Sequence, residues 1–504
     1  MVKVRIDNRE VEVDIGSTIL DAAEKLGIEI PTMCFMKDCE PWTSCMVCLV
    51  EIAGRNDFVP ACGTLAENGM IIRTNSSQLC DARKTALELL LSDHAGDCMG
   101  LCQVACPAKM NIPLMIRQIA AGRLRQAIVT IKRDIALPAV LGRICPAPCE
   151  KVCRRGAIDE AVSICLLKRY VADADIASDK PFLPACDPAK HKRVAIVGAG
   201  PGGLAAAYYL LQAGYACAVF DEHEKPGGML RYGVPAYKLP RDVLDAEIAL
   251  IEKLGLKFSL KTRVNDGVKL ANLQKNFDAV VLASGRARVV MLDGSRADFR
   301  QEPGDGGGAR PMAVRAVAAG KAAALAVSAR LLGKGPSSPI RPFNTSLGRV
   351  REQEAENLRA IFGRVQRVEA ADSAVGFTDS QARAEGRRCM HCDCREAQSC
   401  KLRQYAQQYG ARPRRYQGGR RLFEQQPLKA QKGELIYEPG KCIDCGLCVQ
   451  IASQTGEKIG LTLTGRGFDV RVAAPFGRPV AEGLRQCAEK CVAACPTGAL
   501  AFMD

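Results

Sequence analysis

The chain has 504 residues, of which 48% are hydrophobic and 25% are charged, a composition typical of soluble globular domains. A single hydrophobic core does not grow to this length, so three to five domains are expected. No stretch approaches the roughly 18 uninterrupted apolar residues of a membrane span, and the N-terminus alternates like a strand instead of carrying the apolar core of a secretory signal. These features predict a cytoplasmic protein without a membrane span.

The 25 cysteines are the unusual part of the composition. Most of them fall in tight runs with two or three residues between neighbours. In a long chain without a signal peptide, such runs favour metal ligation over disulfides. Four thiolates also suit zinc, which stays an alternative. Three-cysteine runs and the Cys-Pro endings at Cys106 and Cys495 favour iron–sulfur clusters instead.

Residues 1–80 are predicted to begin with two strands joined by a turn at Asp7 and Asn8. A short helix follows, opened by Thr18 with Asp21 three residues later, in the manner of a capping box. Four cysteines then follow in the pattern C-x10-C-x2-C-x13-C, namely Cys34, Cys45, Cys48 and Cys62.

This cysteine pattern resembles the N-terminal [2Fe-2S] domain of the large iron–sulfur subunit of complex I and of iron-only hydrogenases. The resemblance implies a β-grasp fold whose four cysteines hold two irons. Cys39 and Cys80 lie outside the spacing and are predicted to be ordinary thiols.

Residues 81–188 are predicted to be helical and contain two matched cysteine groups. The first is Cys98, Cys102 and Cys106, and the second is Cys145, Cys149 and Cys153, inside the string CPAPCEKVC. This region resembles the N-terminal domain of the glutamate synthase small subunit and of dihydropyrimidine dehydrogenase, which implies that the two groups interleave to hold [4Fe-4S] clusters.

The chain departs from that pattern at two places. The leading C-x2-C pair is missing before Cys98, and Lys168 stands where an acidic residue or glutamine is expected. Cys165, three residues before Lys168, is a candidate for a further thiolate ligand. Which cysteine joins which cluster stays open at this stage.

Residues 189–335 carry a nucleotide-binding pattern. A buried strand leads into the turn from Gly198 to Gly203, which opens a helix. The three glycines of such a turn permit a tight bend, the approach of a pyrophosphate and close helix–strand packing. The helix N-terminus offers free N–H groups to phosphates. Asp221 ends the next strand, where a carboxylate binds ribose hydroxyls.

Further segments follow this turn in a fixed order, among them Gly227–Leu230, Tyr232–Pro235 and Phe277–Gly285. The series resembles the flavin domain of the glutamate synthase small subunit, which implies bound FAD and a closing motif at Gly304-Asp305. The cofactor-binding residues predicted are Gly198, Gly200, Pro201, Gly202, Gly203, Asp221, Gly228, Met229, Leu230, Val264, Gly285, Gly304 and Asp305.

The relatives insert a second dinucleotide-binding unit for NADPH before the closing motif. In this chain Gly285 and Gly304 are only nineteen positions apart, whereas a βαβ crossover needs about thirty residues. The NAD(P) domain is therefore predicted to be absent. A flavin without a hydride donor must exchange electrons with clusters or with another subunit.

Residues 336–435 are predicted to form a basic linker with a third cysteine motif, and residues 436–504 a ferredoxin-like module. The linker motif can hold a [4Fe-4S] cluster or zinc, and its RCMHC start resembles the missing leading pair; its cysteines are Cys389, Cys392, Cys394 and Cys400. One [4Fe-4S] cluster is predicted in the module on Cys442, Cys445, Cys448 and Cys495. Cys487 and Cys491 are predicted to be spare thiols.

The formal net charge of +15 raises the question of nucleic-acid binding, above all at Arg412–Arg421. Anionic clusters and the FAD diphosphate would cancel about half of this excess, so no nucleic-acid partner is predicted.

The sequence thus predicts a multidomain α/β and α+β protein: a β-grasp [2Fe-2S] domain, a helical [4Fe-4S] domain, a Rossmann-like FAD domain and a ferredoxin-like [4Fe-4S] module. Its expected cofactors are FAD, one [2Fe-2S] cluster and three or four [4Fe-4S] clusters. No catalytic side chains are assigned. The expected role is electron transfer beside a catalytic metalloenzyme subunit or an NADH-oxidising subunit. Flavin-based bifurcation, a stand-alone NAD(P)H oxidoreductase and a zinc-rich scaffold are the alternatives.

Overall fold

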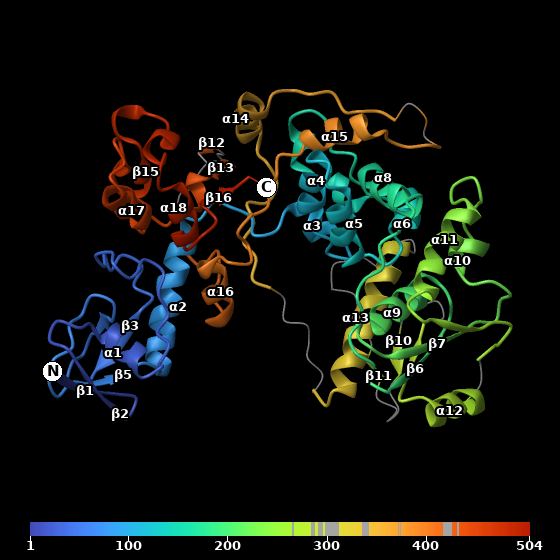
Figure 1. The fold of residues 1–504 in the computed structure, drawn as a ribbon, viewed down its shortest axis with the longest axis horizontal. Coiled ribbons are helices and arrows are strands. Elements are labelled where there is room, and N and C mark those ends of the chain that lie inside the picture. Colours follow the sequence, from blue (N-terminus) through green and yellow to red (C-terminus); the bar gives the residue numbers. More distant parts are fainter. Residues whose placement is uncertain are drawn as a thin grey trace. The chain divides into compact units, whose positions relative to one another are not determined.

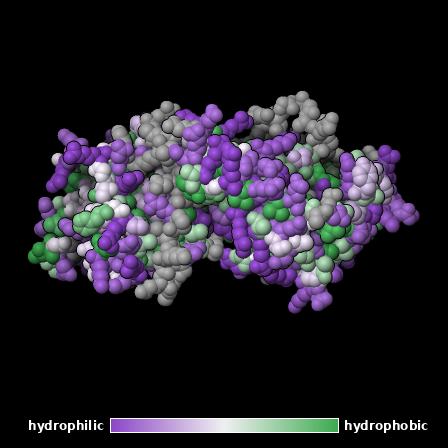
Figure 2. All heavy atoms as spheres, turned by 90° about the horizontal axis from the view of Figure 1, so that it is seen from above, coloured by the Kyte–Doolittle hydropathy of each residue, from purple (hydrophilic) through white to green (hydrophobic). Residues whose placement is uncertain are grey.

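The computed structural model describes residues 1–264, 267–283, 288–290, 296–297, 312–334, 342–370, 372, 374–416, 426–430 and 433–503. The chain forms two compact units (Figure 1). Unit 1 comprises residues 1–99, 341–354 and 392–504, and unit 2 comprises residues 100–340 and 355–391. Among the described helices, none is both long and apolar enough to cross a membrane. Hydrophilic residues cover most of the face seen in Figure 2, with hydrophobic ones scattered between them.

The N-terminal part of unit 1 is a five-stranded sheet with the order β2-β1-β5-β3-β4. Only the β1–β5 pairing is parallel. The strands are β1 (Val2–Ile6), β2 (Arg9–Val13), β3 (Leu49–Ile52), β4 (Phe58–Pro60) and β5 (Ile71–Arg73). The predicted turn at Asp7 and Asn8 is present, with both residues at positive φ.

The predicted capping box is confirmed at the start of α1 (Ile19–Lys25). The Thr18 hydroxyl accepts from the Asp21 N–H at 3.2 Å, while the Asp21 carboxylate accepts from the Thr18 N–H at 2.8 Å. This exchange satisfies two helix-start N–H groups. The apolar side of α1 is buried in the same hydrophobic core as the sheet.

The rest of unit 1 brings distant segments together. Helix α2 (Ser77–Ser92) contacts α16 (Lys401–Gln408). A three-stranded sheet has the order β12-β13-β16, and a separate hairpin pairs β14 with β15. The remaining elements are β12 (Gln426–Ala430), β13 (Gly433–Tyr437), β14 (Thr462–Thr464), β15 (Arg471–Ala473), β16 (Leu500–Phe502), α17 (Leu447–Thr455) and α18 (Ala488–Ala494).

Unit 2 begins with a set of short helices, as the helical periodicity predicts. They are α3 (Leu101–Ala105), α4 (Ile112–Ala120), α5 (Leu124–Lys132), α6 (Pro138–Ile144), α7 (Pro148–Lys151) and α8 (Ile164–Ile176). Gly122 lies in the short connection between α4 and α5, where its φ of 74° favours glycine. Helix α15 (Asp379–Arg387) returns to pack on α4.

The second part of unit 2 is a six-stranded sheet with the order β11-β10-β9-β6-β7-β8. Strand β6 is flanked by β7 and β9, both parallel to it. Its strands are β6 (Arg193–Val197), β7 (Ala216–Phe220), β8 (Lys257–Ser259), β9 (Ala279–Leu282), β10 (Arg288–Val290) and β11 (Arg296–Ala297). The accompanying helices are α9 (Pro201–Gln212), α10 (Met229–Tyr232), α11 (Arg241–Glu252), α12 (Gly267–Asn276) and α13 (Ala313–Leu331).

Helices α9 and α13 approach each other closely at a glycine. A Cβ placed on Gly320 of α13 would lie 2.2 Å from the carbonyl oxygen of Gly202. No side chain fits there, so glycine sets the distance at which α13 covers the start of α9.

Candidate cofactor sites

The glycine turn between β6 and α9 is built as the sequence predicts. Gly198 has a φ of 106°, which side-chain-bearing residues rarely adopt. A Cβ on Gly203 would lie 1.9 Å from the carbonyl oxygen of Gly198, so the helix can meet the turn only with glycine there. A Cβ on Gly200, in contrast, would meet no atom within 4 Å, because it would project into open space.

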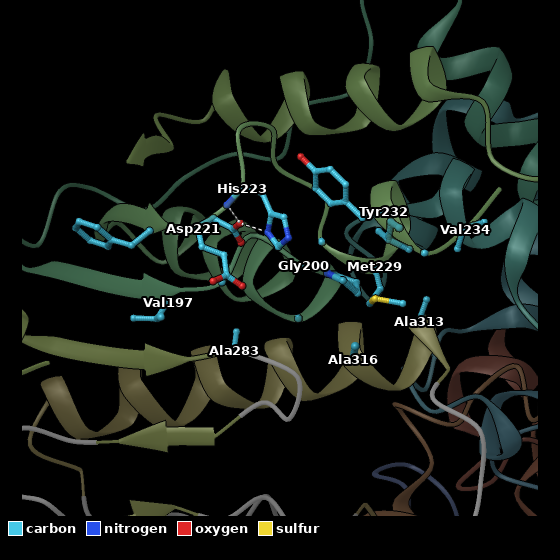
Figure 3. A pocket seen from close by; sticks show the side chains of 18 of the residues that line it. Val197, Gly200, Asp221, His223, Met229, Tyr232, Val234, Ala283, Ala313 and Ala316 are labelled. Atoms are coloured by element: carbon cyan, nitrogen blue, oxygen red, sulfur yellow. Dashed lines mark hydrogen bonds and ion pairs between the residues drawn. The ribbon is translucent and has the colours of Figure 1, made fainter. Parts of the chain in front are cut away.

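That open space belongs to a cavity of about 1170 Å³ in front of the turn (Figure 3). Nine of the predicted cofactor-binding residues line it: Gly198, Gly200, Pro201, Gly202, Asp221, Gly228, Met229, Leu230 and Val264. Gly203 supports the turn from behind through its packing against Gly198. The predictions for Gly285, Gly304 and Asp305 lie outside the described residues.

Asp221 connects the turn to the cavity wall. Its carboxylate accepts from the Ala199 N–H at 2.6 Å and from the His223 N–H at 2.9 Å, and it also contacts His223 Nδ1 at 2.7 Å. The His223 ring stacks on Tyr232 with 4.5 Å between ring centroids. A carboxylate has about four acceptor positions, so Asp221 can hold the turn and still accept a hydroxyl from a ligand.

Sequence reasoning missed several residues of this cavity. His223 and Arg263 line it, together with Ile144 and Pro146 from the helical part of unit 2 and Ala313 from α13. His223 stands two residues after Asp221, which was the available signal. No local sequence pattern indicates that Ile144 or Pro146 lines the cavity, because both reach it through tertiary packing.

In unit 2, one predicted thiol group surrounds Lys168 of α8. Cys165 lies within hydrogen-bonding reach of Cys145 and Cys149. Lys168 interacts electrostatically with four thiols, those of Cys106, Cys145, Cys149 and Cys165. Burial alone would lower the pKa of Lys168, but the neighbouring thiol groups, as thiolates, raise it above its ordinary value. The structure therefore combines one cysteine of the first run, two of the second and Cys165.

The other predicted ligands of unit 2 are Cys102, Cys153 and Cys389. All three are half-buried and pack against the same hydrophobic core as the Lys168 group.

In unit 1, the four cysteines of the predicted [2Fe-2S] site are all buried and come together. The Sγ atoms of Cys48 and Cys62 lie 3.4 Å apart. Hydrogen bonds from Cys45 and Cys62 lower the pKa of the Cys34 thiol to about 2. Since the thiolate is the metal-binding form, a group that stabilises a thiolate fits metal ligation.

The four predicted ligands of the C-terminal module line one small cavity, closed by Tyr437 of β13 and Val472 of β15. Burial raises the pKa of Cys445 to about 12, which favours its neutral thiol unless a cation is bound. Cys491 lines the same cavity, and its Sγ lies 3.7 Å from that of Cys487. The structure thus places Cys491 beside the four predicted ligands, and its assignment as a spare thiol stays a prediction.

The run from Cys389 to Cys400 does not behave as one local group. Cys394 and Cys400 share their surroundings with Cys98, and the Cys394 N–H donates to the Cys98 carbonyl at 3.4 Å. Cys389 belongs to unit 2, whereas the other three cysteines of the run belong to unit 1. Close spacing along the chain therefore does not decide which thiols meet.

Across the described residues, no three His, Cys, Asp or Glu side chains converge on the position of a single metal ion.

Comparison with protein families gives three matches along the chain. Residues 1–77 match the 2Fe-2S iron-sulfur cluster binding domain, and residues 91–180 match dihydropyrimidine dehydrogenase domain II, a 4Fe-4S cluster domain. Residues 196–253 match the NAD(P)-binding Rossmann-like domain.

Curated relatives share part of the chain. It is 40% identical over 205 residues to the NADP(+)-dependent formate dehydrogenase subunit beta of Moorella thermoacetica, covering 36% of this chain and 29% of that one. It is 40% identical over 191 residues to the NADPH-Fe(3+) oxidoreductase subunit beta of Geobacter sulfurreducens (37% and 28%), and 34% identical over 193 residues to the glutamate synthase [NADPH] small chain of Bacillus subtilis (38% and 39%).

The chain is similar to these three subunits over the matched regions. It contains 2Fe-2S, 4Fe-4S and Rossmann-like parts, which confirms the coarse prediction from the sequence. The matched region spans no more than 39% of the length of the three relatives named above. The identity of the nucleotide, the number of clusters and the loss of an NAD(P) domain stay predictions.

Proposed function

We propose that the chain is an electron-transfer flavoprotein subunit, which passes electrons between one FAD and several iron–sulfur clusters inside a larger oxidoreductase complex. One observation carries this proposal: the wall of the nucleotide cavity contains Ile144 and Pro146, the two chain neighbours of Cys145. Cys145 is one of the thiols around Lys168. A flavin in the cavity and a cluster on these thiols would therefore adjoin the same short segment.

The residues present fit FAD. Pro201 and Gly202, at the start of α9, line the cavity, so the helix N-terminus can meet a pyrophosphate. Gly200 leaves the space that the phosphates need, and Asp221 is placed for a ribose. When bound, FAD exchanges electrons in pairs or singly and clusters exchange them singly, and the protein contributes position and environment.

The proposed partners are other redox subunits in the cytoplasm. Two of the relatives above are named beta subunits, which supports assembly into a complex. We infer a catalytic metalloenzyme subunit of the formate dehydrogenase, hydrogenase or aldehyde oxidoreductase type, an NADH-oxidising subunit, or both. Flavin-based bifurcation is an extension of the same proposal.

A second candidate function is a stand-alone NAD(P)H oxidoreductase of the glutamate synthase small-subunit type. It is favoured by the match of residues 196–253 to an NAD(P)-binding domain. The two functions assign the same cavity differently, and reduction kinetics separate them.

The decisive experiment mixes the isolated, anaerobically purified chain with NADH or NADPH in a stopped-flow instrument. Dithionite should bleach the flavin band and reduce the clusters, whereas neither nucleotide should do so at a useful rate. Hydride transfer needs the nicotinamide within about 3–3.5 Å of the flavin ring, and the recognisable phosphate turn is committed to FAD. Rapid, saturable bleaching by either nucleotide would favour the second function.

The FAD assignment itself is tested by Gly200→Val. The added side chain projects into the cavity in front of the turn, so we expect loss of FAD with near-normal iron content. Gly156→Ala is the control, since a Cβ there meets only ordinary contacts at 3.8 Å or more. Stoichiometric flavin in Gly200→Val would place the FAD site elsewhere.

A further inference from the structure

A loop of the N-terminal part of unit 1 is hydrogen-bonded to a helix of the C-terminal module. The side-chain amide of Gln450 on α17 accepts from the Glu40 N–H at 2.8 Å and donates to the Glu40 carbonyl at 3.0 Å. One turn further along, Gln454 donates to the carbonyl of Asp38 at 2.7 Å. These bonds join the loop before Cys45 to the helix that carries Cys448.

Trp42 closes this contact. Its ring lies so close to Gly446 that a Cβ there would fall 2.0 to 2.6 Å from three ring atoms. Gly446 is thus required both by its φ of 76° and by the indole. The indole covers the segment between Cys445 and Cys448, and Trp42 is the single tryptophan of the chain.

One hydrophobic core runs through the contact. It contains Cys34 and Cys45 of the predicted [2Fe-2S] site together with Cys445 of the C-terminal site. Close-packed interiors of this kind leave few voids larger than a water molecule.

The third thiol group of unit 1, formed by Cys98, Cys394 and Cys400 (the Cys98 group), also adjoins the C-terminal site. A Cβ on Gly498, three residues after Cys495, would lie 2.2 Å from the Sγ of Cys394. The Cys394 N–H donates to the Cys98 carbonyl at 3.4 Å. The C-terminal site therefore has the predicted [2Fe-2S] site as one neighbour and the Cys98 group as another.

We propose that the C-terminal site is the middle centre of three in unit 1, and that the Trp42–Gly446 contact is the route between it and the [2Fe-2S] site. This inference rests on the proposed electron-transfer function. In the step, one electron leaves the reduced centre, which is oxidised by one unit, and enters the other, which is reduced by one unit. No bond is made or broken and no proton moves. Trp42 and Gln450 are positioning residues that hold the two sites in register.

The test uses the full chain, reduced anaerobically with dithionite, and the microwave power saturation of its [2Fe-2S] electron paramagnetic resonance signal. A nearby paramagnetic cluster speeds relaxation, so the wild-type signal should be hard to saturate. In Cys445→Ser, which removes a ligand of the middle site, we expect half-saturation at several-fold lower power. Cys80→Ser in α2, the same chemical change at a thiol outside the predicted ligand sets, is the matched control and should leave the saturation of the two-iron signal unchanged.

A second variant tests the proposal independently in case Cys445→Ser misfolds. Trp42→Ala combined with Gln450→Ala should keep both cluster signals and the iron content while moving half-saturation toward that of Cys445→Ser. Gln78→Ala, at an exposed position of α2, is its control. Equal saturation in wild type and both variants, with the two-iron signal intact, would overturn the route but leave the proposed function standing. A wild-type chain without any iron–sulfur signal would overturn the function as well.

Discussion

Each unit buries a lysine beside predicted cluster ligands, but the two lysines are neutralised differently. Lys441 in unit 1 is 1% exposed and its Nζ lies 2.5 Å from a carboxylate oxygen of Glu438, which is also buried. Lys168 in unit 2 is 4% exposed and faces Cys106, Cys145, Cys149 and Cys165. After burial, these four thiols are the largest influences on the pKa of Lys168.

This difference shows which site depends on its cofactor for electrostatic balance. Burial of an uncompensated charge costs several kcal/mol. The charge of Lys441 is offset by Glu438 whether or not a cluster is bound. The charge of Lys168 is offset only when its thiols are ionised, as they are in a metal cluster. We therefore expect unit 2 to couple its stability to cluster loading more strongly than unit 1.

The largest effect is expected from breaking the pair in unit 1. Glu438→Gln leaves the cation of Lys441 buried without its carboxylate and should lower the free energy of unfolding by about 3–5 kcal/mol. Urea unfolding under anaerobic conditions, followed by the fluorescence of Trp42, measures unit 1 selectively because the chain has no other tryptophan. The double variant Glu438→Gln/Lys441→Met removes both charges and should recover most of the loss. If the single variant were as stable as the wild type, Glu438 would not be the group that offsets the buried charge of Lys441.

Removal of Lys168 should disfavour the reduced cluster in the loaded chain but stabilise the fold of the metal-free chain. In the loaded chain, Lys168→Met removes a cation that stabilises an added electron, so the reduction potential of one four-iron centre should become more negative. The interaction has an upper scale of about 4 kcal/mol for charges 4 Å apart at an effective dielectric constant of 20. In the metal-free chain, the same substitution should raise the unfolding temperature, because it removes a buried charge.

An anaerobic redox titration read by electron paramagnetic resonance, with thermal unfolding of the metal-free chain, measures both effects of Lys168→Met. The double variant Glu438→Gln/Lys441→Met serves as the control and should leave that potential unchanged. A reduction potential that did not become more negative, or an unfolding temperature of the metal-free chain that did not rise, would contradict the coupling.

Local features of the fold were predictable because they are encoded within a few residues. The capping box at Thr18, the Asp7-Asn8 turn and the glycine turn at Gly198 each depend on neighbours along the chain, and all three are present. The sequence also grouped the four cysteines that the structure brings together in the N-terminal domain, since one small domain contributes all of them, and their role as ligands stays a prediction.

The grouping of the remaining thiols could not be read in the same way. Cys98 meets Cys394 and Cys400 only because two distant segments pack together within unit 1. In the same way, Ile144 reaches the nucleotide cavity because α6 packs against α11 and α13. Tertiary contacts of this kind leave no periodic signal in the sequence, and the significance of Lys168 became apparent only once its four thiol neighbours were known.

A third buried ionisable group extends the comparison to a carboxylate whose hydrogen-bond partners are backbone N–H groups. Glu247 on α11 is 2% exposed, and its two carboxylate oxygens accept from the N–H groups of Ala139 and Val140 at 2.9 Å each. These donors belong to the first turn of α6, the helix that ends beside Cys145. Burial raises the pKa of Glu247 to about 7, although the two backbone hydrogen bonds lower it in part.

The raised pKa makes a prediction about pH. Between pH 4.5 and 7 the unfolded chain has lost the Glu247 proton while the folded chain keeps it, so the contribution of this group to stability is greatest below about pH 4.5. That contribution should fall by about 3 kcal/mol as the pH rises through about 7, and then level off. Glu247→Gln does not titrate, so it should gain stability relative to wild type over this interval. Thermal unfolding of both proteins at a series of pH values measures the difference, and Glu252→Gln, an exposed position on the same helix, should show none. A difference that stayed constant from pH 4.5 to 8 would mean that the two N–H groups of α6 hold Glu247 ionised throughout, and that backbone donors balance a buried charge as completely as Glu438 balances Lys441.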